Sequence, residues 1–148
     1  MEQEEFYSRI KIGEKIPPLE KEATLAEHEM PQIFRGIELA AESDEAQKKA
    51  ENLGVDSIHT SRVFGGVTVL QFVSQMITDW LPNPRGWVQG GRISAKFIGL
   101  VRFNEIITCQ GQVRDKIVQD GQKYLVCDIW VENSKGERVV VGEASISY

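Results

Sequence analysis

The sequence has 148 residues, of which 41% are hydrophobic, and this suits a single domain with a continuous core. The formal net charge is -5 and basic residues are interspersed with acidic ones, so we expect no nucleic-acid partner. The apolar stretches are broken by polar residues, and the first residues are acidic where a signal peptide is basic. We therefore expect a cytoplasmic protein that has no membrane partner.

Metal-ligand spacings are absent from the sequence. The only histidines are His28 and His59, and the only cysteines are Cys109 and Cys127. No Cys-x-x-Cys, His-x3-His or His-Glu-x-x-His pattern occurs among them. We expect no metal site.

The N-terminal segment, residues 1–20, is charged and contains Gly13 and the pair Pro17-Pro18. This composition predicts an irregular surface arm that leads into a domain formed by residues 21–148.

Two short helices are predicted next. Thr24 and Glu27 match a capping box that starts a short helix, and Pro31 either ends or kinks that helix or begins a second one. Ser43 is followed by two acidic residues that suit the start of a surface helix over residues 44–53.

The most apolar helix is predicted over residues 67–80, after Gly65-Gly66. Its apolar residues recur at helical spacing and form a stripe broad enough for the centre of a fold. They are Val69, Phe72, Val73, Met76, Ile77 and Trp80, with Val67 and Leu70 widening the stripe.

Beyond Pro84 the hydrophobic period changes from helical spacing to two, and four strand-like runs follow. In the first run Arg92, Ser94 and Lys96 point away from the apolar face. The inward residues, run by run, are Trp87, Ile93, Ala95 and Phe97; Ile107, Cys109, Val113 and Ile117; Leu125, Cys127, Ile129 and Val131; and Val140, Gly142, Ala144 and Ile146.

The Asp120-Gly121 turn joins the second and third runs. A three-residue loop with Gly121 in the left-handed conformation pairs residue 118 with 122 and keeps both apolar faces inward. This register places Cys109 opposite Val131 and Cys127 opposite Val113, so the two sulfurs lie roughly 13 Å apart along the sheet, beyond disulfide reach. We expect two free thiols in the core.

One buried helix followed by an antiparallel sheet predicts an α+β hotdog fold, in which the sheet wraps around a long central helix. A lone sheet of this size leaves an edge strand exposed, so we expect pairing between two chains in a dimer.

Two segments carry a family resemblance. The stretch from Gly90 to Arg102, with Asn104-Glu105 and Gly111-Gln-Val after it, and the last hairpin from Val131 to Ala144 are similar to the MaoC-like hydratase/dehydratase family, which includes R-specific enoyl-CoA hydratases. The similarity covers roughly residues 20–148. Leu100 stands where that family usually has proline, and Asn104 where it has glycine.

The resemblance implies reversible hydration of a 2-enoyl thioester by an Asp and a His five positions later, which hold one water between them. At the corresponding positions this sequence has Ile37 and Glu42. The family's motif is therefore absent from its usual place.

A related pattern follows in the loop ahead of Gly65-Gly66. Asp56 and His59 are either a relocated acid/base pair or a loop held by local hydrogen bonds. Gly65 and Gly66 either admit a thioester carbonyl to the helix start or serve tight packing. Arg62 is the candidate for contact with the phosphates of coenzyme A, whereas Arg92 and Lys96 fit an exposed strand face.

These residues are compatible with three functions. The first is a hydratase or dehydratase of an acyl-CoA or acyl-carrier thioester, with coenzyme A present only as part of the substrate. The second is a non-catalytic hotdog subunit that binds the acyl-CoA beside a catalytic partner, and the third is a hotdog thioesterase. Either a homodimer or a heterodimer with another hotdog chain suits the fold.

Overall fold

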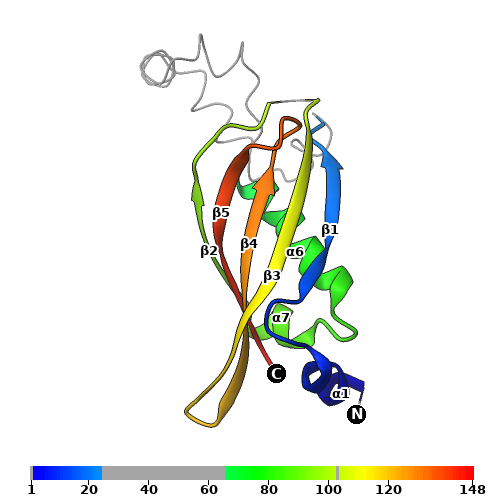
Figure 1. Cartoon of the computed structure of the whole chain (residues 1–148), viewed down its shortest axis with the longest axis vertical. Helices are drawn as coiled ribbons and strands as arrows, with labels where there is room; N and C mark the ends of the chain where they lie inside the picture. Colours follow the sequence, from blue (N-terminus) through cyan, green and yellow to red (C-terminus); the bar gives the residue numbers. More distant parts are fainter. Residues whose placement is uncertain (1, 25–65, 103) are drawn as a thin grey trace.

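The computed structural model describes residues 2–24, 66–102 and 104–148. Its five strands form an antiparallel sheet in the order β1-β3-β4-β5-β2, and helix α6 lies across one face of that sheet (Figure 1). The elements are α1 (Glu2–Arg9), β1 (Lys15–Glu22), α6 (Gly66–Trp80), α7 (Arg85–Gly90), β2 (Arg92–Phe97), β3 (Ile106–Gln119), β4 (Gln122–Glu132) and β5 (Arg138–Ser147). The predicted α+β hotdog architecture is confirmed.

Helix α6 begins at Gly66, one residue before the predicted start, and ends at Trp80 as predicted. Its buried residues are Thr68, Val69, Phe72, Val73, Met76 and Ile77. The predicted stripe is too wide at its N-terminal end, because Val67 is 51% exposed. Among the described residues no helix is both long enough and apolar enough to cross a membrane.

The prediction of an irregular arm over residues 1–20 is wrong, because these residues contain α1 and most of β1, which pairs with β3. Pro17 and Pro18 obscure the strand in the sequence. They lie where the register against β3 shifts, between Ile16 and Leu19. Proline is tolerated there because β1 is an edge strand, whose outer side needs no backbone donor.

Helix α1 packs against the end of the molecule where the C-terminus lies (Figure 1). The ring of Tyr7 stacks on Tyr148 with 3.9 Å between centroids, and Phe6 meets Trp80 of α6 edge-on at 5.5 Å. The Lys116 Nζ donates a hydrogen bond of 2.6 Å to the Tyr7 carbonyl. The N-terminal segment is therefore part of the packed domain.

Strand β4 follows the predicted alternation, whereas in β5 a register shift leaves both Val139 and Val140 buried. All four inward residues of β4 are buried, as are Val140, Ala144 and Ile146 of β5. The first run differs from the prediction at both ends. Phe97, which was predicted to face the core, is 51% exposed, and Pro84 precedes a short helix, α7, in which Trp87 lies. Trp87 is still buried, and its Nε1 donates a hydrogen bond of 2.9 Å to Ser74 Oγ on α6.

The β3–β4 turn differs from the prediction, although the core register is as predicted. The turn has two residues, Asp120 and Gly121, with φ of 52° and 77°, as a two-residue hairpin loop requires. A bulge between Val113 and Asp115 then shifts the register by one residue. Ile117 lies between the turn and the bulge, so it faces away from the core and is 36% exposed, contrary to the prediction.

Beyond the bulge, Cys109 pairs with Val131 and Cys127 with Val113, as predicted. Both cysteines are free and fully buried. The bulge therefore reconciles a two-residue turn with two inward-facing apolar strands.

Candidate functional site

The N-terminal turn of α6 is the described feature best suited to bind an electron-rich oxygen. The first backbone N–H groups of any α-helix have no acceptor within the helix, and the helix dipole places partial positive charge there. In α6 this turn begins with Gly66 and carries no acidic side chain that would compete for those donors.

Gly66 is placed against Phe97 of β2. A Cβ atom at position 66 would lie 2.9 Å from Phe97 Cε1, closer than ordinary packing allows. With glycine at position 66 the Phe97 ring can lie close to the start of α6, and a larger residue there would require the ring to move. The role of Gly66 in admitting a carbonyl group stays a prediction.

Thr68, also in the first turn, is a further candidate that the sequence pattern did not indicate. It is 1% exposed, and its Oγ1 has no hydrogen-bond partner in the part of the chain that the structure describes. A buried hydroxyl without a partner costs about 1–3 kcal/mol, which a ligand oxygen would offset. The available signal was a single hydroxyl at an otherwise apolar face of the helix.

The other site residues predicted from the sequence lie outside the described residues. They are Asp56, His59, Arg62 and Gly65, together with Ile37 and Glu42 at the positions of the family motif. The acid/base pair and the phosphate contact of Arg62 therefore stay predictions.

Neither buried thiol is suited to nucleophilic chemistry. Burial raises the pKa of Cys109 to about 12, and nearby Lys21 lowers it only in part. Burial, with a smaller contribution from Asp128, also raises the pKa of Cys127 to about 12. The thiolate is the reactive form of cysteine, so both side chains act as core residues at neutral pH. Across the described ranges, no three His, Cys, Asp or Glu side chains gather as a metal site would require.

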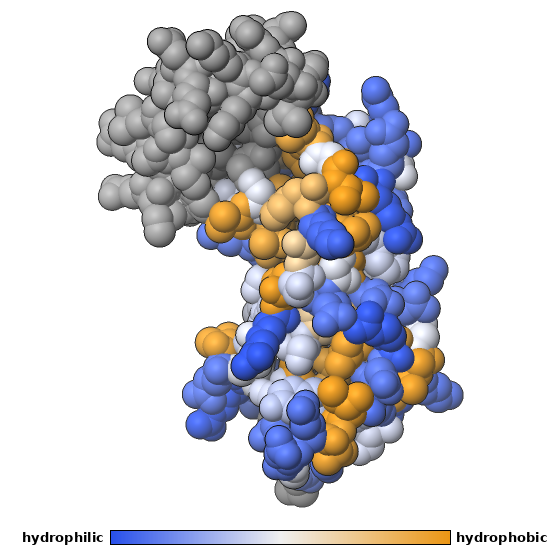
Figure 2. Space-filling model, turned by 90° about the vertical axis from the view of Figure 1, so that its left-hand side faces the viewer, coloured by the Kyte–Doolittle hydropathy of each residue, from blue (hydrophilic) through white to orange (hydrophobic). Residues whose placement is uncertain are grey.

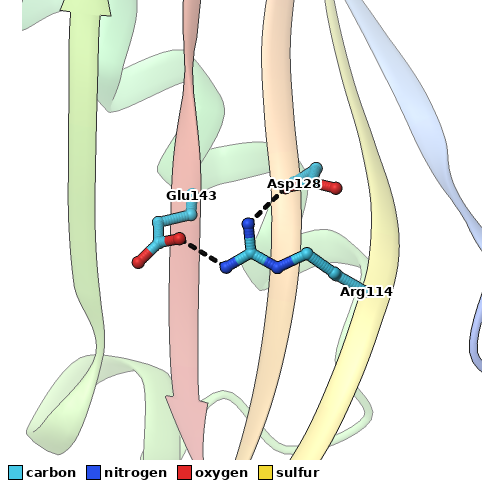
Figure 3. A network of polar contacts seen from close by, with 3 residues as sticks. All are labelled: Arg114, Asp128 and Glu143. Carbon is cyan, nitrogen blue, oxygen red and sulfur yellow. Dashed lines mark hydrogen bonds and ion pairs between the residues drawn. The ribbon is translucent and has the colours of Figure 1, made fainter.

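The outer face of the sheet carries an ion-pair network centred on the bulge residue Arg114 (Figure 3). Its guanidinium donates a 2.9 Å hydrogen bond to Asp128 on β4 and a second hydrogen bond to Glu143 on β5. The hydrogen bond to Glu143 is the main cause that raises the pKa of Arg114. Because both carboxylates occupy its donors, Arg114 acts as a link between three strands.

The two basic residues of β2, Arg92 and Lys96, are exposed together with Ser94 between them. This agrees with the expectation that they form a solvated strand face. They lie on the edge strand at the end of the sheet opposite β1.

No protein-family model matches the sequence, and no curated protein matches it either. Solved structures with similar folds include R-hydratase PhaJ1 from Pseudomonas aeruginosa, at 18% identity over 95% of this chain and 83% of that one, with a TM-score of 0.63. The (R)-hydratase from A. caviae involved in PHA biosynthesis shares 17% identity over 93% of this chain and 96% of its own, also with a TM-score of 0.63.

A third similar structure is the HadBC 3R-hydroxyacyl-ACP dehydratase complex from Mycobacterium tuberculosis, at 14% identity over 93% of this chain and 96% of that chain, with a TM-score of 0.62. The chain has the hotdog fold of these hydratases and dehydratases. At such low identities the likeness establishes the fold, and the chemistry has to be argued from the residues.

Proposed function

We propose that this protein is a hydratase or dehydratase of acyl-CoA or acyl-carrier thioesters. The observation that carries the proposal is the first turn of α6, where Gly66 allows close packing and the buried Thr68 hydroxyl has no partner within the described residues. The likeness in fold to R-hydratases and to a 3R-hydroxyacyl-ACP dehydratase supports the same class of reaction.

In the proposed reaction, His59 takes a proton from water. Asp56 orients the His59 side chain or acts as its acid partner. The water oxygen adds to the β-carbon of the 2-enoyl thioester, and the electron pair of the double bond moves toward the carbonyl oxygen. Donors of the first turn of α6 stabilise the charge that develops there. A proton delivered to the α-carbon completes the hydration, and dehydration is the reverse sequence.

The acid/base role is tested by His59→Ala in a hydration assay with a 2-enoyl-CoA. We expect turnover to fall by about 10²-fold or more, because general acid–base catalysis contributes on that order. Glu42→Gln is the matched control at the position of the family motif and is expected to leave turnover nearly unchanged. Hydrolysis of the thioester, monitored as free thiol, distinguishes hydration from thioesterase activity.

The carbonyl site is tested separately by Thr68→Val, which removes the hydroxyl and keeps the branched shape. A buried hydroxyl without a partner does not stabilise the free protein, so its melting temperature is expected to stay the same or rise. Turnover is expected to fall, because the hydroxyl would no longer serve the substrate. Reduced stability with unchanged turnover would show that Thr68 has only a structural role.

A second candidate is a non-catalytic subunit that binds the acyl-CoA beside a catalytic hotdog chain. The observation in its favour is Ile37 and Glu42 where the family carries its Asp and His. HadBC is described as a complex, which supports assembly of two hotdog chains as a mode for this fold. If the wild-type protein binds acyl-CoA without hydrating it, and His59→Ala binds equally well, the second candidate replaces the first.

A further inference from the structure

A groove lies on the outer face of the sheet, which is the face opposite α6. Tyr124, Ser145 and Ser147 alternate along their strands with core residues, so they point to this outer face. Together with the end of α7 and the tip of the β3–β4 hairpin, they line a groove with a volume of about 680 Å³. Small-molecule sites typically have volumes of roughly 300–1,000 Å³. The sheet separates this groove from the first turn of α6, so the groove is not part of the candidate thioester site.

The walls of the groove are fastened to the end of β5. A Cβ atom at Gly90 would lie 2.6 Å from Ser147 Oγ, so glycine at this position lets α7 lie close against β5. The Ser147 hydroxyl donates a hydrogen bond of 3.1 Å to the Gly86 carbonyl. On the other wall, the Gln122 side chain donates a hydrogen bond of 3.2 Å to the backbone oxygen of Tyr148. The groove is therefore a built part of the fold.

The lining of the groove is polar and has no net charge. Among the described residues that line it, the charged side chains are Arg92 and Asp120, whose charges cancel. The other polar side chains are carboxamides and hydroxyls, from Gln89, Gln119, Gln122, Tyr124, Ser145 and Ser147. Carboxamide and hydroxyl groups both donate and accept hydrogen bonds, as a ligand hydroxyl does. This lining therefore favours a neutral ligand that carries many hydroxyl groups.

An apolar surface lies at the centre of the polar lining. Ile117 lies opposite Tyr124 in the pairing of β3 with β4, and both residues line the groove. Ile117 is 36% exposed and Tyr124 is half-buried, so both side chains are accessible from the groove. The tyrosine ring is apolar on its faces and polar at its hydroxyl. A sugar ring combines an apolar C–H face with hydroxyl groups in the same way, and it fits this pair of side chains.

An extended peptide fits the groove less well than a sugar. Extended peptides gain affinity mainly from main-chain hydrogen bonds at a free sheet edge. Across the floor of the groove, β3 pairs with β4, β4 with β5, and β5 with β2. Because the main chain is engaged in the sheet there, the side chains provide most of the binding groups.

The surface around the groove also differs from a typical protein interface. Figure 2, which views the side of the molecule on which β2 lies, shows hydrophilic and hydrophobic residues interspersed over the half away from the grey residues. Protein interfaces usually have a contiguous apolar centre. The mixed surface favours a small polar ligand over a second protein chain.

We propose that this groove binds a neutral oligosaccharide. Tyr124 and Ile117 pack against the apolar face of one sugar ring, and the carboxamides of Gln119 and Gln122 bind its hydroxyls. From β2 to β3 the groove crosses three strand spacings, or roughly 14 Å, which is longer than a single sugar ring. This binding function is additional to the proposed thioester chemistry and does not depend on it.

The proposal is tested by titrating the isotope-labelled full-length protein with maltotriose, cellotriose and triacetylchitotriose, and following the amide signals by NMR. We expect at least one of these sugars to cause saturable shifts at the side-chain amides of Gln119 and Gln122. Gln119→Ala and Tyr124→Ala should each weaken binding of that sugar by roughly 2–10-fold, the effect of one lost hydrogen bond or more. Gln110→Ala is the matched control and should bind as wild type does, because Gln110 lies on the same strand opposite Trp130, outside the groove.

The proposal is wrong if none of the three sugars causes saturable shifts, or if the shifts lie outside the groove. An equal loss of affinity in Gln110→Ala and Gln119→Ala would also overturn it. Shifts at the groove with a neutral glycine–serine hexapeptide, and with none of the sugars, would assign the groove to a peptide instead. Tyr124→Phe keeps the ring and should retain more affinity than Tyr124→Ala, which separates ring packing from a folding defect.

Discussion

The two buried thiols make the stability of the fold sensitive to alkaline pH. Burial raises the pKa of Cys109 and Cys127 from 9.0 to about 12, whereas the unfolded chain keeps thiols near the ordinary value. Above about pH 9 the unfolded state therefore binds fewer protons than the folded state. The free energy of unfolding is unaffected by the thiols below that pH, and falls as pH rises toward 12.

The size of the loss in unfolding free energy follows from the pKa of each thiol in the unfolded and in the folded chain. At about pH 10, one unit above the unfolded pKa, each thiol removes about 1.4 kcal/mol, so the pair removes about 3 kcal/mol. This is a large part of the roughly 5–15 kcal/mol that stabilises a typical domain. Both side chains are fully buried, so solvent does not screen the effect.

The assay is urea denaturation at several pH values between about 8 and 10, repeated on Cys109→Ala/Cys127→Ala. The double variant is less stable at every pH because it leaves cavities, but its free energy of unfolding should fall less steeply with pH. The difference in slope isolates the thiols from lysine and tyrosine titration. Equal slopes in the two proteins would refute the reasoning, as would rapid reaction of both thiols with a disulfide reagent in the native state.

Two further perturbations test the packing and the outer face. Ile77→Ala in α6 removes a fully buried side chain and should lower the free energy of unfolding by about 2–5 kcal/mol in urea denaturation. Val88→Ala, at a position 75% exposed, should lower it little. Similar losses in the two variants would contradict the central place of α6. Arg114→Ala should lower the free energy of unfolding by about 1 kcal/mol or less per ion pair, and this loss should shrink in high salt. A loss independent of salt would mean that packing by the Arg114 side chain dominates.

Much of the fold was predictable because the spacing at which hydrophobic residues recur along the chain reflects which side chains are buried. The inward residues of β4 follow a spacing of two without interruption, and the centre of the α6 stripe, from Val69 to Ile77, is both predicted and buried. Strand β1 was missed because Pro17-Pro18 reads as a break, and only its place at the edge of the sheet makes proline acceptable. Edge position is a property of the whole topology, which a local pattern does not contain.

In the β3–β4 hairpin two errors of the prediction cancel: the predicted turn is one residue too long, and the bulge in β3 was not predicted. A two-residue turn alone would put the apolar faces of the two strands on opposite sides, and the longer predicted loop avoided this conflict. The molecule resolves it instead with the extra residue Arg114 in β3. Both solutions give the same pairing of Cys109 with Val131, because the burial of the apolar faces fixes the register and the turn adapts to it.

The candidate site was less predictable than the fold. Gly66 was identified as a residue of close approach, but its neighbour Phe97 is 31 positions away in the sequence and only the folded chain brings the two together. Thr68 was overlooked because a threonine inside an apolar helical stripe is compatible with simple packing. Its significance comes from the lack of a partner for Oγ1, which is a property of three-dimensional contacts.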